Sequence, residues 1–226
     1  MASVPIHDDR LRDAKDVMYR ALILDSAEEV FAEAGFEHAQ VKDVAGRAGI
    51  SLATLYARFP TKLELYRAVH ARRLGDLMAR AVRPAKGADA LDRMLDAIEA
   101  YVAFHVAHPH YLGMHLRDGN AWSVREGLRT GEQVEAWTRG QERMVKTFRE
   151  GIRAGLFVDD DPVWMARTTN ALHQVALTMW AEGGKKMAVE TLLSRVRAQF
   201  IRTFCVPELV PSLLARRTAR PAQEGK

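Results

Sequence analysis

Basic and hydroxyl-bearing side chains recur in residues 40–62, which read QVKDVAGRAGISLATLYARFPTK. Lysine and arginine attract phosphate, hydroxyl and phenol groups donate hydrogen bonds to phosphate oxygens, and small apolar side chains let a backbone approach base edges. This stretch is therefore a candidate nucleic-acid interface, although its spacing alone favours an ordinary surface helical hairpin equally. The candidate residues are Gln40, Lys42, Arg47, Ser51, Leu52, Ala53, Thr54, Tyr56, Arg58 and Lys62.

A second group of polar side chains stands inside an apolar segment late in the chain. Asn170, His173 and Gln174 occupy positions i, i+3 and i+4 of an expected helix, among residues such as Leu172 and Leu177. A buried polar group needs a hydrogen-bond partner, and small-molecule sites combine apolar walls with a few polar groups. The trio predicts either a ligand pocket or the polar centre of an interface with a second copy, and the residues favour neither.

Four histidines between residues 105 and 115 raise the question of a metal site. His105 and His108 share a helix face, but Pro109 interrupts the helix before His110, and no carboxylate stands at a helical spacing that would complete a site. We expect pocket and surface histidines, and no metal. The chain also has no G-x-S-x-G, phosphate-loop or zinc-protease signature, so we predict no enzyme and no cofactor.

Two short helices joined by a tight turn would present the 40–62 stretch. Apolar residues recur at i, i+3, i+4 and i+7 between positions 41 and 48, which predicts a short amphipathic helix. Gly49 supplies the backbone freedom that a helix end needs, and Ser51 can cap the next helix. In that second helix Leu55 and Phe59 can pack inward. The pattern predicts a helix-turn-helix.

Over residues 23–65 the chain resembles the TetR family of transcriptional regulators. The segments that carry the resemblance are ILDSAEEVFAEAGFE, VKDVAGRAGIS and ATLYARFPTKLEL, and their order, spacing and residue types agree over roughly forty positions. Two positions depart from the family pattern. Gly is usual where Ala53 stands, and Ser or Thr is usual near Gln40, so the first helix of the motif has a poorer cap and the outward surface is one methyl bulkier.

The resemblance implies a small-molecule pocket in the C-terminal half, between the fourth and eighth helices, with movement of the fourth helix altering the spacing of two DNA-reading heads. For any single aromatic or methionine the alternative is ordinary core packing. The candidate ligand residues are Met78, Ile98, Tyr101, Val102, His105, Met114, Trp122, Met144, Phe148, Asn170, His173, Gln174 and Leu177.

Charge is unevenly distributed along the chain of 226 residues, whose formal net charge is +4. Seven cations and two carboxylates lie between His38 and Arg73, whereas residues 25–37 carry five acids and no base. A local excess of positive charge is the expected footprint of phosphate contact. We therefore expect the predicted helix-turn-helix to carry the positive surface of the protein.

Composition indicates an ordinary globular protein, with 48% hydrophobic and 27% charged residues. The single cysteine, Cys205, excludes an internal disulfide framework. No secretion signal is visible, and no run of about eighteen apolar residues could span a membrane. These features predict a cytoplasmic protein without a membrane partner.

Helical periodicity without convincing alternation at period two predicts an all-α fold of about nine helices. The first long helix is expected from about residue 12 to Gly35, and Thr61 and Glu64 form a capping box at the start of the fourth. The expected parts are a flexible arm at 1–12, a helix-turn-helix domain at 13–60, a linking helix at 61–80, a ligand-binding and dimerisation domain at 81–206, and a disordered tail at 207–226.

The last two long helices carry apolar stripes that would suit a four-helix interface between two copies, although both stripes could instead close an intramolecular core. A dimer would place two recognition helices about 34 Å apart, the repeat of successive major-groove faces. The candidate interface residues are Leu172, Met179, Leu192, Val196 and Phe200.

Together these features predict a homodimeric regulator that binds double-stranded DNA and is released from a palindromic operator by a small apolar or aromatic effector. An activator or a ligand-independent regulator is the nearest alternative. A helical small-molecule binding protein or enzyme with a vestigial helix-turn-helix is the other, favoured only by Ala53 and the poor cap at Gln40.

Overall fold

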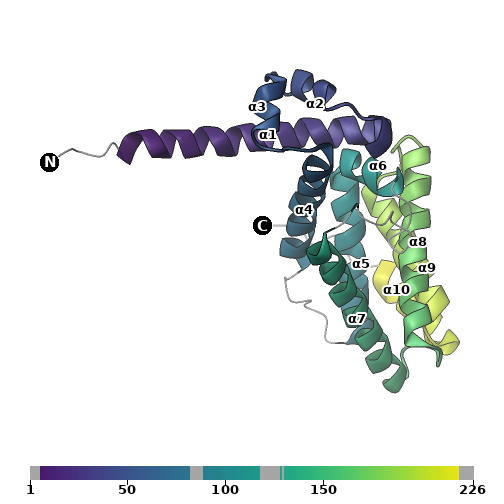
Figure 1. Ribbon diagram of the computed structural model, residues 1–226. Coiled ribbons are helices and arrows are strands. Elements are labelled where there is room, and N and C mark those ends of the chain that lie inside the picture. Colours follow the sequence, from purple (N-terminus) through teal and green to yellow (C-terminus); the bar gives the residue numbers. More distant parts are fainter. Residues whose placement is uncertain (1–5, 82–88, 118–127, 129, 219–226) are drawn as a thin grey trace. The chain divides into compact units, whose positions relative to one another are not determined.

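The computed structural model describes residues 6–81, 89–117, 128 and 130–218, and nearly all of this part of the chain is helical (Figure 1). Ten α-helices and one short 3-10 helix confirm the predicted all-α class, with one helix more than expected. They are α1 (Ile6–His38), α2 (Val41–Arg47), α3 (Leu52–Tyr56), α4 (Lys62–Ala81), α5 (Ala90–Ala107), α6 (Pro109–Arg117), α7 (Gly131–Arg153), α8 (Pro162–Glu182), α9 (Val189–Phe204), η1 (Pro207–Leu209) and α10 (Val210–Thr218).

The chain divides into two compact units, each formed from two segments. The first unit comprises Met1–Leu74 and Gly113–Thr130, and the second comprises Gly75–Leu112 and Gly131–Lys226. One division falls inside α4, the helix that the sequence predicts to link the halves. The C-terminal part of α6 joins the first unit, where the Nε of Arg117 donates to the backbone oxygen of Ala32 at 2.9 Å.

The first unit has an apolar core built from α1, α2, α3 and the start of α4. The side chains predicted for this core are all buried, namely Ile23, Val30, Phe31, Val44, Leu55 and Phe59. The ring of Tyr66 meets Phe31 and Phe36 edge-on, with both centroid separations at 4.9 Å. This packing holds α2 and α3 along the side of α1, as Figure 1 shows.

The long first helix differs from its prediction at the start and is kinked near its end. It begins at Ile6 rather than near residue 12, so part of the predicted flexible arm is helical. Gly35 leaves helical geometry, with φ at 73° and ψ at 166°. A positive φ is strained for residues with a Cβ, which explains why a glycine marks the end of the straight segment.

The second unit packs α5 against α7, α8 and α9. Its helices begin where local signals predict. Asp89 accepts a hydrogen bond from the backbone N–H of Asp92 at 2.8 Å, and Asp161 accepts one from Val163 at 2.8 Å. Pro162 opens α8 because a proline lacks only an N–H that the first turn would leave unbonded.

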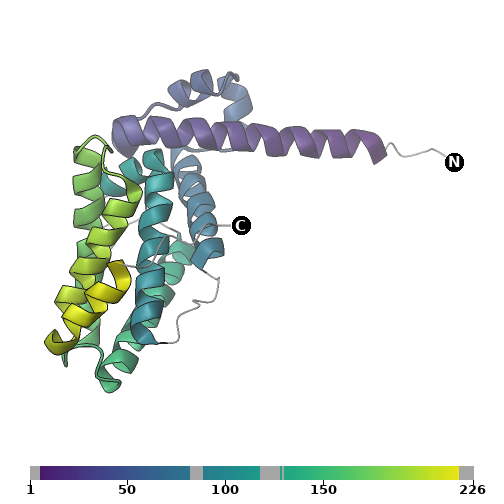
Figure 2. The same ribbon diagram turned by 180° about the vertical axis from the view of Figure 1, so that it is seen from behind.

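The prediction of a disordered tail is wrong for residues 207–218, which form η1 and α10. Helix α10 packs against α9, and Figure 2 shows this from behind. Just before it, Cys205 forms an isolated antiparallel bridge with Phe157, and Val206 donates its N–H to the backbone oxygen of Leu156 at 3.1 Å. These backbone bonds hold the end of α9 to the loop after α7, which compensates for the low apolar content of the segment. Residues 219–226 lie outside the described part.

Candidate nucleic-acid interface and interior polar cluster

Helix α3 is the predicted recognition helix, and its first turn is held by a cap. Ser51 Oγ accepts a hydrogen bond from the backbone N–H of Thr54 at 3.0 Å and lies 2.8 Å from the Thr54 hydroxyl. The cap therefore forms as the sequence predicts. Because the two hydroxyl groups bond each other, part of their capacity for phosphate contact is already used within the helix.

The outward face of α3 is small and apolar apart from one phenol. Leu55 is fully buried and anchors the helix, whereas Leu52 is 42% exposed and Tyr56 is 43% exposed, with Ala53 exposed between them. Adjacent exposed apolar side chains can mark an interaction site, whereas isolated ones are common. These three side chains form the exposed face of α3.

Arg47 is bound by acidic residues of α1. Its two terminal nitrogens donate to the two carboxylate oxygens of Glu33 at 2.8 and 2.9 Å, and one also contacts Glu29 at 3.3 Å. The hydrogen bond to Glu33 is the main cause that raises the pKa of Arg47. The structure therefore places this predicted DNA-contacting guanidinium against α1.

Arg58 also binds side chains of α1, and it thereby links α3 to that helix. Its Nε lies 2.8 Å from Asp16 Oδ1, and its guanidinium lies 4.8 Å from the centre of the Tyr19 ring. One terminal nitrogen also donates to the backbone oxygen of Thr54 at 3.0 Å. Such a stacked and paired arginine positions a helix and has few donors left for phosphate.

Lys62, at the start of α4, binds the chain segment that precedes α2. Its Nζ donates to the backbone oxygens of Glu37 at 3.0 Å and Ala39 at 3.2 Å, and lies 4.8 Å from the centre of the Phe36 ring. The predicted cap of this helix is present, because Thr61 Oγ1 accepts from the N–H of Glu64 at 3.1 Å. Lys62 thus orients the segment before α2.

Two polar residues at the start of α2 remain on the surface. Gln40 makes no side-chain cap, as its residue type predicts, and its Nε2 donates to the backbone oxygen of His38 at 3.4 Å. Lys42 is exposed, and no hydrogen bond or ion pair within the described residues engages its amine. Of the predicted cations of the interface, Lys42 is the one with its charge directed to solvent.

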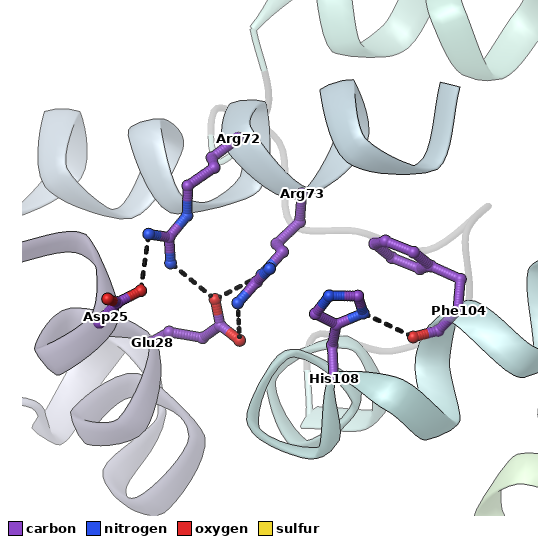
Figure 3. A network of polar contacts seen from close by, with 6 residues as sticks. All are labelled: Asp25, Glu28, Arg72, Arg73, Phe104 and His108. Carbon is purple, nitrogen blue, oxygen red and sulfur yellow. Dashed lines mark hydrogen bonds and ion pairs between the residues drawn. The ribbon is translucent and has the colours of Figure 1, made fainter. Parts of the chain in front are cut away.

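A buried carboxylate joins α1 to α4, and no local pattern in the sequence predicts it. Glu28 is 5% exposed in its side chain and lies between two arginines (Figure 3). Arg73 Nε contacts it at 2.7 Å and an Arg72 nitrogen at 3.1 Å, while Arg72 also reaches Asp25 at 2.7 Å. The acidic run of α1 and the basic run that follows it therefore neutralise each other in part. The expected positive surface is correspondingly smaller than the local count of charges implies.

In the second unit, aromatic and imidazole rings gather where α5 meets α8. The Tyr101 ring centre lies 4.3 Å from that of His105 and 5.6 Å from that of His173. Tyr111 approaches His105 at 5.8 Å. His105 Nδ1 lies 2.9 Å from the backbone oxygen of Tyr101, and since a carbonyl only accepts, Nδ1 carries the proton. Three of the predicted ligand residues are thus in one cluster.

The motif geometry and the fold agree with a known family. The family model for bacterial regulatory proteins of the tetR family matches residues 23–69, which run from the middle of α1 through α2 and α3 into α4. Residues 23–69 therefore carry a segment of the tetR family. The structure of the ketosteroid transcriptional regulator KstR2 of Mycobacterium tuberculosis has the same fold, with a TM-score of 0.71, 22% identity, and coverage of 83% of this chain and 95% of that one.

Two relatives are transcription regulators, one named as an activator and the other as a repressor. The chain is 39% identical over 87 residues to the transcriptional activator FasR of Mycolicibacterium smegmatis, and the match covers 38% of this chain and 39% of FasR. It is 27% identical over 144 residues to the transcriptional repressor SCO4008 of Streptomyces coelicolor, covering 63% of this chain and 69% of that protein. The match therefore spans about two fifths of the length of FasR. These proteins are regulators and not enzymes, which agrees with the prediction for this chain.

The other predicted ligand residues that the structure describes are distributed through both units. Met114 lies in the first unit, and Trp122 lies outside the described residues. Phe148 packs among Phe157, Phe200 and Phe204, at centroid separations of 5.2 to 6.0 Å, and so belongs to an aromatic core. Of the remainder, Ile98, Val102 and Leu177 are buried, and Met78, Met144, Asn170 and Gln174 are partly buried.

The predicted interface residues of α9 face the interior of their own chain. Leu192, Val196 and Phe200 are buried, so they cannot also contact a partner, and their assignment to an interface is corrected. The apolar stripe of α9 closes the core against α5 and α8, which was the alternative. On α8, Leu172 is partly buried and Met179 is 62% exposed.

Among the described residues, no group of three or more His, Cys, Asp or Glu side chains is placed to hold a metal ion. No helix in the described ranges is both long enough and apolar enough to cross a membrane.

Proposed function

We propose that the protein is a homodimeric repressor that binds a palindromic operator and leaves it when a small molecule enters the second unit. The observation that carries the proposal is the outward face of α3, where Leu52, Ala53 and Tyr56 project from a helix that Ser51 caps and Leu55 anchors. A rigid helix with exposed small and apolar side chains is suited to the major groove, in which apolar atoms contact the methyl group of thymine.

The distribution of free cations supports a division of roles on this face. Lys42 projects to solvent at the start of α2, whereas Arg47, Arg58 and Lys62 bind groups of the protein itself. Phosphate contacts supply affinity for any sequence, and base contacts supply preference. Lys42 therefore serves phosphate contact, and Leu52 serves sequence preference.

The outer face of α8 supports the dimer. Trp164, Val175 and Met179 are 67, 57 and 62% exposed, and helical periodicity puts them on one side of α8. Large apolar side chains exposed on one side of a helix are suited to an interaction site. Because the apolar residues of α9 are buried within their own chain, the second copy docks on α8. Analytical ultracentrifugation checks this: Val175→Glu with Met179→Glu is expected to give monomers, and an unchanged dimer refutes the surface.

A mobility shift at defined salt tests DNA binding, using the intact protein and a fragment from its own promoter region. We expect a complex at protein concentrations below about 1 µM that survives competitor DNA. Leu52→Ala is expected to change the preferred sequence, and Lys42→Ala to weaken binding to all fragments alike. Absence of a complex below about 1 µM, or equal effects of both substitutions, refutes the proposal.

Activation is the second candidate function, since FasR is named as an activator and is 39% identical in the matched segment. A repressor and an activator differ in how deletion of the gene changes neighbouring transcript levels. Neighbouring transcripts rise if the protein is a repressor and fall if it is an activator. Transcript levels in a deletion strain therefore decide between them, while the DNA-binding experiment stands in either case.

A further inference from the structure

We propose that Asn170 and His173 bind the effector, and that the effector is an uncharged molecule with a carbonyl or hydroxyl oxygen on an apolar skeleton. The inference rests on the proposed ligand response. It goes further by naming the polar groups that hold the ligand and the chemical class that they select.

The two side chains are one helical turn apart on α8, and each leaves a buried atom unbonded. His173 is 4% exposed, and neither its Nε2 nor the Nδ2 of Asn170 has a hydrogen-bond partner among the described residues. More than nine in ten buried polar groups in folded proteins are bonded, because a buried group without a partner is destabilising. Two such atoms in neighbouring turns are therefore available to a bound molecule.

A second copy of the chain cannot supply that partner. Successive residues of an α-helix are about 100° apart, so His173 stands on the opposite side of α8 from Trp164 and Val175. That outer side is exposed, whereas the side of His173 faces α5, where the Tyr101 ring lies 5.6 Å from the imidazole. The alternative between pocket and interface, which the sequence leaves open, is thereby decided in favour of the interior.

The groups present select a neutral ligand. Burial lowers the pKa of His173 to about 4, so the imidazole is uncharged at neutral pH. On α5 the one arginine, Arg93, pairs with Glu150, and on α9 Arg197 pairs with Glu99 at 2.6 Å. The remaining lysines and arginines of α7, α8 and α9 are exposed. A carboxylate or phosphate would be buried here without a counter-charge, which is strongly unfavourable.

The donor set also restricts the polar group of the ligand. The Nδ2 of Asn170 carries only hydrogens to donate, so it requires an acceptor oxygen. The Nε2 of a neutral imidazole donates in one tautomer and accepts in the other, so it can bond a carbonyl or a hydroxyl. The adjacent ring of Tyr101 provides an apolar face for the skeleton that carries this oxygen. A ketone, an ester or an alcohol meets these requirements.

A titration monitored by nuclear magnetic resonance tests the proposal on the full chain, with acetophenone, ethylbenzene and benzoate as probes. The three share a phenyl ring and differ in bearing a neutral oxygen, no polar group or a charge. We expect acetophenone to bind about tenfold more tightly than the other two and to shift the Asn170 side-chain amide and the His173 ring nitrogens. In Asn170→Leu and in His173→Phe, acetophenone should lose this advantage while ethylbenzene binds as before.

Gln199→Leu, an exposed polar change on α9, is the matched control and should leave the advantage intact. Folding is monitored by thermal unfolding, where Asn170→Leu should not lower Tm, because it removes an unbonded group. Equal binding of acetophenone and ethylbenzene, binding of none of the three probes, or unchanged signals of Asn170 and His173 overturns the inference. A mobility shift on the same samples separates the proposed ligand site from the proposed function. If the ketone preference is absent while DNA binding is intact, only the ligand site is refuted. If DNA binding is absent, the proposed function is refuted.

Discussion

Arg47 and Glu33 form a two-point contact between α2 and α1, in which both terminal nitrogens of the guanidinium meet both oxygens of the carboxylate, at 2.8 and 2.9 Å. Paired parallel hydrogen bonds fix the orientation of both groups. The first helix of the DNA-reading motif is therefore attached to α1 by a residue whose type and position predict a phosphate contact. Lys42, on the same helix, has no such engagement within the described chain.

The salt dependence of DNA binding should separate these two cations. Each phosphate contact that is lost reduces the slope of log affinity against log salt by about 0.9. We expect Lys42→Ala to reduce the slope by about one contact, and Arg47→Ala to leave it nearly unchanged. Filter binding over a series of salt concentrations measures both slopes. Equal reductions would show that Arg47 leaves Glu33 to bind DNA.

Loss of the Glu28 carboxylate should destabilise the first unit. In Glu28→Gln the largely buried guanidinium groups of Arg72 and Arg73 lose their counter-charge, which we expect to lower the free energy of unfolding by about 3 kcal/mol. Asp25 is 63% exposed in its side chain, so Asp25→Asn serves as the control and should cost less than about 1 kcal/mol. Urea unfolding measures both variants. Similar costs would mean that the buried position of Glu28 is unimportant.

Two glycines of α7 should differ in how their substitution by alanine changes stability. A Cβ at Gly151 would overlap the ring of Phe157, which is itself buried against Phe148. Gly151→Ala should therefore cost about 3 kcal/mol of unfolding free energy through overpacking. Nothing lies within 4 Å of a Cβ at Gly140, so Gly140→Ala should stabilise the helix by about 0.5–1 kcal/mol. Thermal unfolding of both variants checks this, and a stable Gly151→Ala protein would contradict the packing.

Titration of His173 should lower the free energy of unfolding at acidic pH. Burial lowers the pKa of this side chain from 6.5 to about 4, so as the pH falls through 6.5 the unfolded chain gains a proton that the folded chain does not. The contribution of His173 to stability is complete above about pH 6.5 and decreases as the pH approaches 4, by up to about 3 kcal/mol.

Comparison of unfolding free energies at pH 7 and pH 4.5 tests this assignment. His173→Phe should show a smaller decrease than the natural chain. His110, which is exposed, provides the control, because His110→Phe should retain the full decrease. An unchanged decrease in His173→Phe would assign the acid sensitivity to other groups.

The single thiol should be unreactive in the folded protein. Cys205 is buried at the end of α9, and burial, with a smaller contribution from Asp89, raises its pKa to about 12. Because the thiolate is the nucleophile, we expect negligible reaction with an aromatic disulfide reagent at pH 8 and one thiol per chain once denaturant is added. Rapid labelling without denaturant would show that the bridge between Cys205 and Phe157 opens readily.

Local signals in the sequence were enough to place most of the helices. Ser51, Asp89 and Asp161 each cap the helix that follows them, as their positions predict. A cap depends on residues within a few positions of one another, so it can be recognised without knowing the fold. The helical tail is not predicted, for the complementary reason. Helix α10 is stabilised by packing on α9 and not by its own composition.

The assignment of side chains to surfaces succeeded only in part. Leu52 and Tyr56 face outward as predicted, because their burial follows from the period of one short helix. The apolar stripe of α9 was equally compatible with a dimer and with the core, and its burial against α5 and α8 excludes it from the surface. Periodicity identifies an apolar face but does not identify what covers it.

The sequence by itself determined the order of the helices, the helix-turn-helix and the resemblance of that segment to the tetR family, because each depends on short-range patterns of residue type. Only the tertiary structure decided which charges and polar groups are free. Arg47 reaches Glu33 across 14 positions and Arg72 reaches Asp25 across 47, so no local pattern reveals that these charges cancel. The same holds for His173 and Tyr101, which come together only because α8 packs on α5. Long-range packing thus removed several cations from the candidate DNA surface and left two buried polar groups for a ligand.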